Sequence, residues 1–127
     1  MKKIGYTIVV VAILVLVVQF FRNQASQDTI LSRDIHALLE EGEKQIDLTA
    51  LADFEWVAVE VFGPYTTNEM IEDSMNIQFK GDDGGIAVLE DRFLLVFANQ
   101  KRAIKTAVLS RKYGDYIIME NKLLTVN

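Results

Sequence analysis

The sequence contains no cysteine. A chain without thiols has no disulfide framework, no thiolate nucleophile and no lipid-modified cysteine. It also has a single histidine and no G-x-S-x-G elbow, so the groups that most often form a nucleophile and base pair are scarce. That histidine, His36, stands near Asp34 on the polar side of a predicted helix, where we expect it to be solvated. We therefore expect that the protein is not an enzyme.

Motifs for metal ions and phosphate groups are missing as well. The densest acidic pair, Asp82-Asp83, lies in a glycine-rich stretch, but it lacks the alternating acids and the closing glutamate of an EF-hand. No G-K-[ST] follows these glycines, so they do not form a phosphate loop. We interpret the stretch as a solvated hairpin turn, and we expect no metal and no cofactor.

Basic residues are in the minority. The chain has 13 Lys and Arg against 18 Asp and Glu, and leaving out Lys2 and Lys3 gives 11 against 18, a net charge of −7 from Arg22 onward. This sign disfavours nucleic acid as a partner. A chain of 127 residues leaves room for one domain with a modest core once the apolar N-terminal segment is subtracted.

One long hydrophobic run dominates the N-terminal part. No charged residue lies between Lys3 and Arg22, and residues 8–18 are all Ile, Val, Ala or Leu. As a helix, residues 4–21 reach about 27 Å, close to the thickness of a hydrocarbon core. The sequence therefore predicts a membrane anchor over residues 1–24. Its representative lipid-facing residues are Ile8, Val11, Leu14 and Val18.

Two alternatives concern the fate of this segment. The first is a cleaved signal peptide, but residues 23–25 offer only a poor cleavage site, and Phe20 and Phe21 instead suit a membrane interface. The second rests on residues 3–8, K-I-G-Y-T-I, which resemble the start of type IV prepilins, cut after the glycine. This resemblance implies a pseudopilin-like structural subunit, although Val10 stands where those proteins usually carry glutamate.

The charges around the run predict its orientation. Lys2 and Lys3 precede it, whereas Arg22 and then Asp28 follow it. By the positive-inside rule the N-terminus is cytoplasmic and the rest of the chain is extracytoplasmic. We therefore predict a single-pass protein of the cell membrane whose partners are the lipid bilayer and another envelope protein.

An amphipathic helix or stalk is predicted over residues 25–45. Aliphatic residues recur at helical spacing between Asp28 and Glu41, and Gly42 stands at the position of a left-handed C-terminal cap. The polar residues 23–27 permit either one continuous helix with the membrane segment or a break between the two.

Residues 46–127 are predicted to form a small α+β domain. Alternating valines predict a strand over residues 55–62, and the spacing of Thr66 and Glu69 is that of a capping box, which predicts a short helix to Met75 with Asn76 as its stop. The rest is predicted to be an antiparallel β-meander of four or five strands. Its segments are 76–79, 86–89, 93–98, 103–109, 116–119 and 122–126.

Aromatic residues are concentrated around the first of these strands. Because such side chains serve as binding anchors, we predict a partner-binding site at Trp56, Phe62, Tyr65 and Glu69. The alternative is that Trp56 and Phe62 share a face of the core while Tyr65 packs over the short helix. A third hypothesis is a hydrolase that works through carboxylates meeting in space. The acids in question are Glu55, Glu60, Glu69 and Glu72.

The same segment carries a family resemblance. Residues 54–66 read F-x-W-V-x-V-x-x-F-x-P-Y-T, and residues 94–97 read L-L-V-F. This pattern resembles a group of small bacterial membrane or lipid-anchored proteins of unknown function, in which an acid follows the tryptophan; Val57 replaces that acid here. The similarity covers residues 47–106 and implies an envelope-facing α+β domain without an activity.

The predicted order of elements is also similar, at the level of the fold, to outer-membrane assembly lipoproteins and β-lactamase inhibitor proteins, which are binding modules. Together with the missing catalytic residues and the predicted anchor, this favours a membrane-tethered, extracytoplasmic and non-catalytic interaction module.

Overall fold

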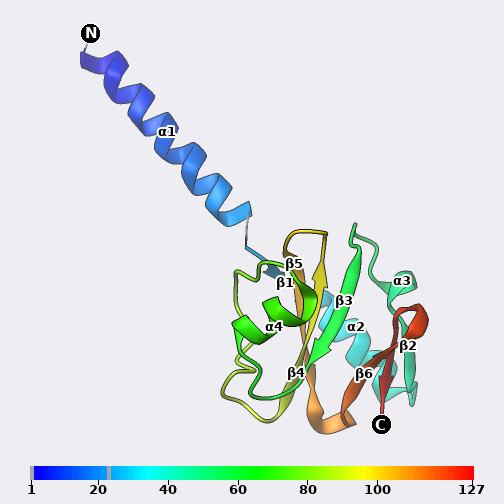
Figure 1. Ribbon diagram of the computed structural model, residues 1–127. Coiled ribbons are helices and arrows are strands. Elements are labelled where there is room, and N and C mark those ends of the chain that lie inside the picture. Colours follow the sequence, from blue (N-terminus) through cyan, green and yellow to red (C-terminus); the bar gives the residue numbers. More distant parts are fainter. Residues whose placement is uncertain (1, 23) are drawn as a thin grey trace.

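The computed structural model describes the backbone of residues 2–22 and 24–127, and the side chains of residues 4–18 and 24–127 (Figure 1). It combines helices with two sheets, which confirms the predicted α+β class. The elements are α1 (Lys2–Arg22), β1 (Ser26–Gln27), α2 (Thr29–Glu40), β2 (Gln45–Asp47), α3 (Leu48–Leu51), β3 (Ala58–Phe62), α4 (Asn68–Met75), β4 (Arg92–Ala98), β5 (Ala103–Ser110), η1 (Arg111–Tyr113), β6 (Tyr116–Met119), η2 (Glu120–Lys122) and β7 (Leu123–Val126).

The larger sheet has four strands in the order β1-β5-β4-β3. Strands β3, β4 and β5 are successive antiparallel neighbours, with Val59 opposite Phe97 and Val96 opposite Thr106, whereas β1 pairs in parallel with β5. The central strand β4 is apolar almost throughout, and residues 93–98 are all buried. Such a strand is stable only where both faces of its sheet are covered.

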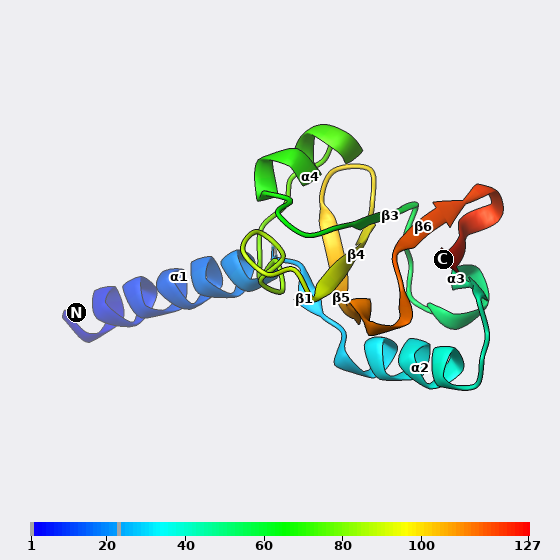
Figure 2. The same ribbon diagram turned by 90° about the horizontal axis from the view of Figure 1, so that it is seen from below.

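Helices α2 and α4 cover the two faces of this sheet (Figure 2). Successive side chains of β4 point to opposite sides. Leu95 and Phe97 belong to the core cluster that includes α2, and Leu94 and Val96 belong to a second cluster around Ile71 of α4. The sheet is therefore the middle layer of three.

A second, antiparallel sheet has the order β2-β7-β6, with Ile46 opposite Leu124, and its inner side joins the α2 side of the core. The prediction of one continuous meander is therefore wrong for β6 and β7. It is also wrong for residues 76–79 and 86–89, which form a loop with isolated bridges. Phe79 and Ile86 belong to this loop, and each has its own side chain buried in the core. Their apolar character therefore does not indicate a strand.

Helix α2 confirms the helix predicted after Asp28. The Asp28 carboxylate accepts the backbone N–H of Leu31 at 2.9 Å, and Gly42 has the left-handed φ of 94° expected after the helix. Strand β1 lies between α1 and α2, and α2 packs against β5. Helix α2 is thus part of the packed domain and does not continue α1 as a stalk.

Helix α4 confirms the short helix after β3, with one correction at its start. The N-cap is Thr67, whose hydroxyl accepts the N–H of Met70 at 3.2 Å, whereas the Thr66 hydroxyl donates to the carbonyl of Gly63 at 2.8 Å. The cap is therefore displaced by one residue, and the predicted capping box is wrong, because Met70 instead of Glu69 occupies the third helical position. Asn76 ends the helix in the left-handed conformation, as predicted.

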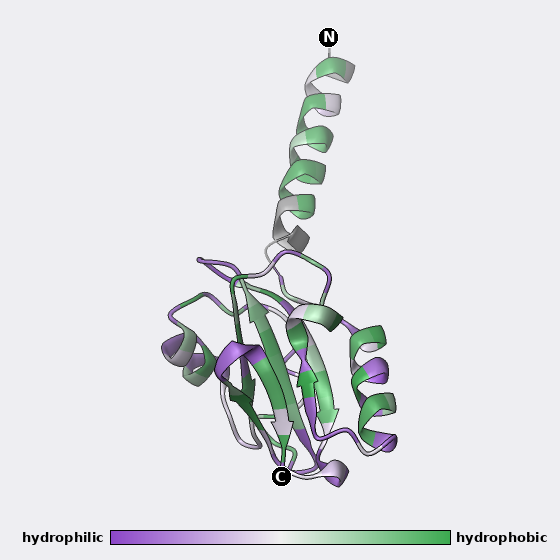
Figure 3. Cartoon of the chain, turned by 90° about the vertical axis from the view of Figure 1, so that its right-hand side faces the viewer, coloured by the Kyte–Doolittle hydropathy of each residue, from purple (hydrophilic) through white to green (hydrophobic). Residues whose placement is uncertain are grey.

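Helix α1 covers the predicted membrane segment and is apolar over most of its length (Figure 3). The representative residues Ile8, Val11, Leu14 and Val18 are all at least half exposed. Within the described part of the chain, none of the helices combines the length and the hydropathy needed to cross a membrane. The roles predicted for Lys2, Lys3, Phe20 and Phe21 fall on side chains outside those described.

Candidate functional site

Trp56, the first residue of the predicted site, is held firmly in place just before β3. Its ring meets that of Phe97 edge-on at 5.1 Å, and its indole N–H donates to the carbonyl of Ala52 at 3.2 Å. The ammonium of Lys122 lies 4.5 Å from the ring centroid. Trp56 is therefore half-buried, with a cation over its ring.

Phe62 lies at the opposite end of β3 from Trp56. It packs against the cluster on the α4 side of the sheet, whereas Trp56 packs against the cluster on the α2 side. The two aromatic residues do not share one face of the core, so that alternative is wrong.

Tyr65 and Glu69 lie beyond the Phe62 end of the strand. Tyr65 is 54% exposed, its backbone N–H donates to the carbonyl of Ile86, and its hydroxyl donates to the carboxylate of Glu90, which raises the pKa of Tyr65. Glu69 is exposed in the first turn of α4, where a carboxylate complements the helix dipole. The four predicted residues therefore do not form one patch.

Between these two ends lies a groove bounded by two strand edges. Among the described residues, β3 pairs only with β4, and β6 pairs only with β7. These free edges face each other where the two sheets adjoin (Figure 1). The two strands contact each other, and a hollow of about 540 Å³ opens beside them, lined by residues 59–62, Ser74 and residues 116–118.

The hollow continues towards the start of β3. A neighbouring space of about 400 Å³ is lined by residues 57–60, residues 74–75 and Lys122. Because both spaces share Val59, Glu60 and Ser74, they form one groove along the whole strand, which we call the β3–β6 groove. Sequence reasoning missed it because it requires β6, a strand that is distant in the chain.

Apolar side chains line and border this groove. Val57 is 55% exposed and Ile117 is 44% exposed, although both are β-branched residues that usually pack against neighbours. Met119, at the end of β6, is exposed as well. The groove therefore offers apolar surface beside the unpaired backbone of β3.

The middle of the groove carries an uncompensated negative charge. Glu60 accepts a hydrogen bond from the Ser74 hydroxyl at 2.8 Å, and within the described residues it takes part in no ion pair. The neighbouring helix α4 contains three acids and no basic residue. Lys122, at the far end, is already engaged, since its ammonium donates to the carbonyl of Val57 at 3.3 Å and covers Trp56.

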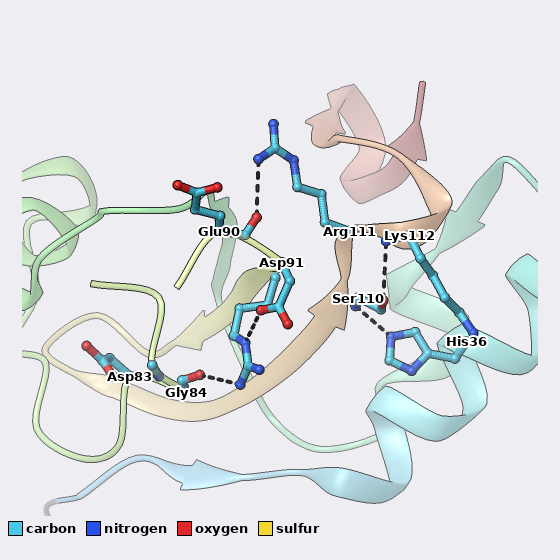
Figure 4. Close-up of polar contacts among 10 residues, drawn as sticks. His36, Asp83, Gly84, Glu90, Asp91, Ser110, Arg111 and Lys112 are labelled. Carbon is cyan, nitrogen blue, oxygen red and sulfur yellow. Dashed lines mark hydrogen bonds and ion pairs between the residues drawn. The ribbon is translucent and has the colours of Figure 1, made fainter. Parts of the chain in front are cut away.

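His36 is not the solvated side chain that the sequence suggested. Its Nε2 accepts the backbone N–H of Ser110 at 2.9 Å (Figure 4). Its ring stacks on that of Tyr113, with 5.6 Å between the ring centroids. Partial burial, followed by the nearby Lys112 ammonium, lowers the pKa of His36, while Glu40 acts in the opposite direction. The histidine fastens α2 to the end of β5.

The acidic residues considered for metal binding or hydrolysis serve local structure. The carboxylates of Asp82 and Asp83 each accept a backbone N–H two residues later at 2.8 Å, which shapes the turn. Glu72 accepts the N–H of Phe79 at 3.0 Å, and Glu55 is exposed. Among the described residues, no three metal-ligating side chains converge.

Comparison of the chain with protein-family models, with curated proteins and with solved structures gives no match. The resemblance to the group of small membrane or lipid-anchored proteins therefore stays a prediction.

Proposed function

We propose that this protein is a non-catalytic, membrane-tethered interaction module that binds an extended peptide segment of another envelope protein in the β3–β6 groove. The observation that carries the proposal is the free edge of β3, which borders an open groove together with the neighbouring strand β6. Such an edge presents a row of backbone N–H and C=O groups to which a further strand adds.

The sequence of β3 is compatible with this use. Proteins protect edge strands with lysine, proline, bulges or a covering segment, because bare edges aggregate. Strand β3 reads A-V-E-V-F, contains no lysine or proline, and pairs with β4 without a shift of register. Its one charged residue, Glu60, lies in the groove itself.

The chemistry of the groove defines the segment that it accepts. An added strand places alternate side chains towards the groove, where the apolar side chains of β3 and β6 lie. Glu60 has no cationic partner among the described residues, so a lysine or arginine in the middle of the bound segment gains an ion pair. We therefore assign an extended segment with apolar residues around a basic one.

Helix α1 is the proposed tether. A helix that is hydrophobic on all sides needs an apolar environment, and the described side chains of α1 are exposed all around. The uncharged run in the sequence, residues 4–21, is long enough for a hydrocarbon core. In this proposal the N-terminus is cytoplasmic and the groove is extracytoplasmic, where it meets envelope proteins.

The binding experiment uses the full-length chain in detergent and short random peptides displayed on phage. The expected result is enrichment of peptides with apolar residues on alternate positions around a lysine or arginine. A synthetic peptide from that set is then titrated by fluorescence polarisation. Glu60→Gln is expected to weaken binding by about two- to fivefold, which is the range of one partly exposed ion pair.

Two further variants test the location of the site. Ile117→Glu places a charge on the apolar wall and is expected to abolish binding, whereas Val88→Glu, at a position that is 76% exposed and outside the groove, is expected to leave it unchanged. Thermal unfolding verifies that each variant is folded. The proposal is refuted when the selected peptides bind all variants equally, or when they slow amide exchange elsewhere than in β3 and β6.

A further inference from the structure

The domain is basic around the point where α1 joins it, although the chain as a whole has a net charge of −5. Ala25 follows shortly after α1, and its backbone N–H donates to the carbonyl of Lys80 at 2.7 Å. The same residue forms a parallel bridge with Gly81. Lys80 is therefore fixed beside the first residues of the domain.

The turn between β4 and β5 lies next to this segment (Figure 1). The backbone N–H of Gln78 donates to the carbonyl of Lys101 at 2.9 Å. Within the turn, the side-chain oxygen of Asn99 accepts the N–H groups of Lys101 and Arg102, both at 2.8 Å. Two separate segments of the chain thus bring their cations to the root of α1.

Basic residues predominate in these two segments, the first of which is followed directly by Asp82 and Asp83, whose carboxylates accept backbone N–H groups of the next turn. Residues 76–81 and 98–106 contain four basic residues and neither Asp nor Glu. One of the four, Lys105, pairs with Asp28 at 3.5 Å. We call Lys80, Lys101 and Arg102 the root cluster; both lysines are exposed and the arginine is half-buried. Exposed Val57 borders the same turn.

We propose that the root cluster binds the phosphate groups of anionic lipids in the membrane that holds α1, and that it thereby keeps the domain against the bilayer surface. This inference rests on the proposed tether. Ala25 follows Arg22, the last residue of α1, by three positions, and three extended steps of the chain span at most about 11 Å. The root cluster is therefore confined close to the headgroups.

Electrostatics act strongly over that distance. The Debye length is about 10 Å at an ionic strength of about 0.1 M, so basic groups held this close to an anionic surface are attracted to it. Acids that lie more than a Debye length from the surface are screened, so their charge does not cancel the attraction. The tether and the cluster together favour a lipid surface over a soluble polyanion.

The experiment exploits the absence of cysteine. Gln100→Cys gives the full-length chain one labelling position in the turn between Asn99 and Lys101, and an environment-sensitive fluorophore is attached there. The protein is reconstituted into phosphatidylcholine vesicles with or without phosphatidylglycerol. Some lipids carry a quencher on the headgroup. The expected result is a blue shift and strong quenching only in the vesicles with phosphatidylglycerol.

A matched pair of variants isolates the root cluster. Lys101→Glu is expected to reduce quenching to the level seen in phosphatidylcholine alone. Lys44→Glu makes the same change of charge at an exposed position between α2 and β2, and it is expected to keep the quenching. Circular dichroism verifies that both variants are folded.

Flotation of the vesicles separates the two proposals. Failure of the chain to float with either kind of vesicle overturns the tether. Flotation with equal quenching in both lipids, or with quenching that survives Lys101→Glu, overturns the lipid contact while the tether stands. Soluble glycerol phosphate is added to the phosphatidylcholine vesicles as well, and a fluorescence response to it would identify a free phosphate site and also overturn the lipid contact.

Discussion

Replacement of His36 by phenylalanine tests the link between α2 and β5. The variant retains an aromatic ring for Tyr113 but loses the acceptor for the N–H of Ser110. A buried donor left without its acceptor costs about 1–3 kcal/mol, so the free energy of unfolding is expected to fall by that amount at neutral pH. Urea unfolding followed by the fluorescence of the single tryptophan, Trp56, measures this loss.

The pH dependence of the same comparison gives a sharper test. The imidazole accepts a hydrogen bond only when neutral, and burial together with Lys112 lowers its pKa in the folded protein below the ordinary value of 6.5. Below that value the unfolded chain therefore binds more protons than the folded protein, and the free energy of unfolding falls as the pH falls. The contribution of His36 is complete above pH 6.5 and disappears as the pH falls through the lower, folded pKa.

The difference in stability between the wild type and His36→Phe is thus expected to shrink between about pH 7.5 and about pH 5, a range in which histidine titrates and most carboxylates remain ionised. Arg33→Gln, at an exposed position on α2, serves as a control whose difference from the wild type stays constant. A difference in stability between the wild type and His36→Phe that stays constant or increases on acidification would refute the role assigned to the hydrogen bond with Ser110.

Two further predictions concern single side chains. Thr106 is 1% exposed, and its hydroxyl has no hydrogen-bond partner among the described residues. Thr106→Val is therefore expected to raise the free energy of unfolding by about 1–2 kcal/mol, measured by thermal unfolding. A loss of stability would contradict the absence of a partner for the hydroxyl. Asn76 ends α4 with a φ of 54°. Asn76→Ala is therefore expected to lower the free energy of unfolding by about 1 kcal/mol, whereas Asn76→Gly is nearly neutral. Urea midpoints that fall equally for both variants would contradict this reasoning.

The elements that the sequence predicted correctly have local causes. Helix α2 has its aspartate cap and its aliphatic spacing within one stretch, and α4 has its stop at Asn76. Strands β3 to β6 stand as short apolar runs between turns. The pairing of β2 with β7 joins residues about eighty positions apart, and no local sequence pattern predicts such a contact. The second sheet could therefore not be predicted from the sequence.

The candidate site shows the same limit. Trp56 and Tyr65 are close in sequence, but the five residues of β3 between them extend about 17 Å, so they cannot meet in one patch. The groove that does exist needs the free edge of β6, which appears only after two sheets have formed. What the sequence did contain was a short strand, A-V-E-V-F, without lysine or proline.

The order of the four-stranded sheet makes the groove and the proposed tether compatible. Strand β1, which follows α1, occupies one edge, and β3 occupies the other, with β5 and β4 between them. Three strand spacings separate these edges, about 14 Å. A partner segment that adds to β3 therefore extends the sheet away from α1. Only the Val57 end of the groove borders the turn that carries Lys101, so a domain held against the bilayer still presents the rest of its open edge to the envelope.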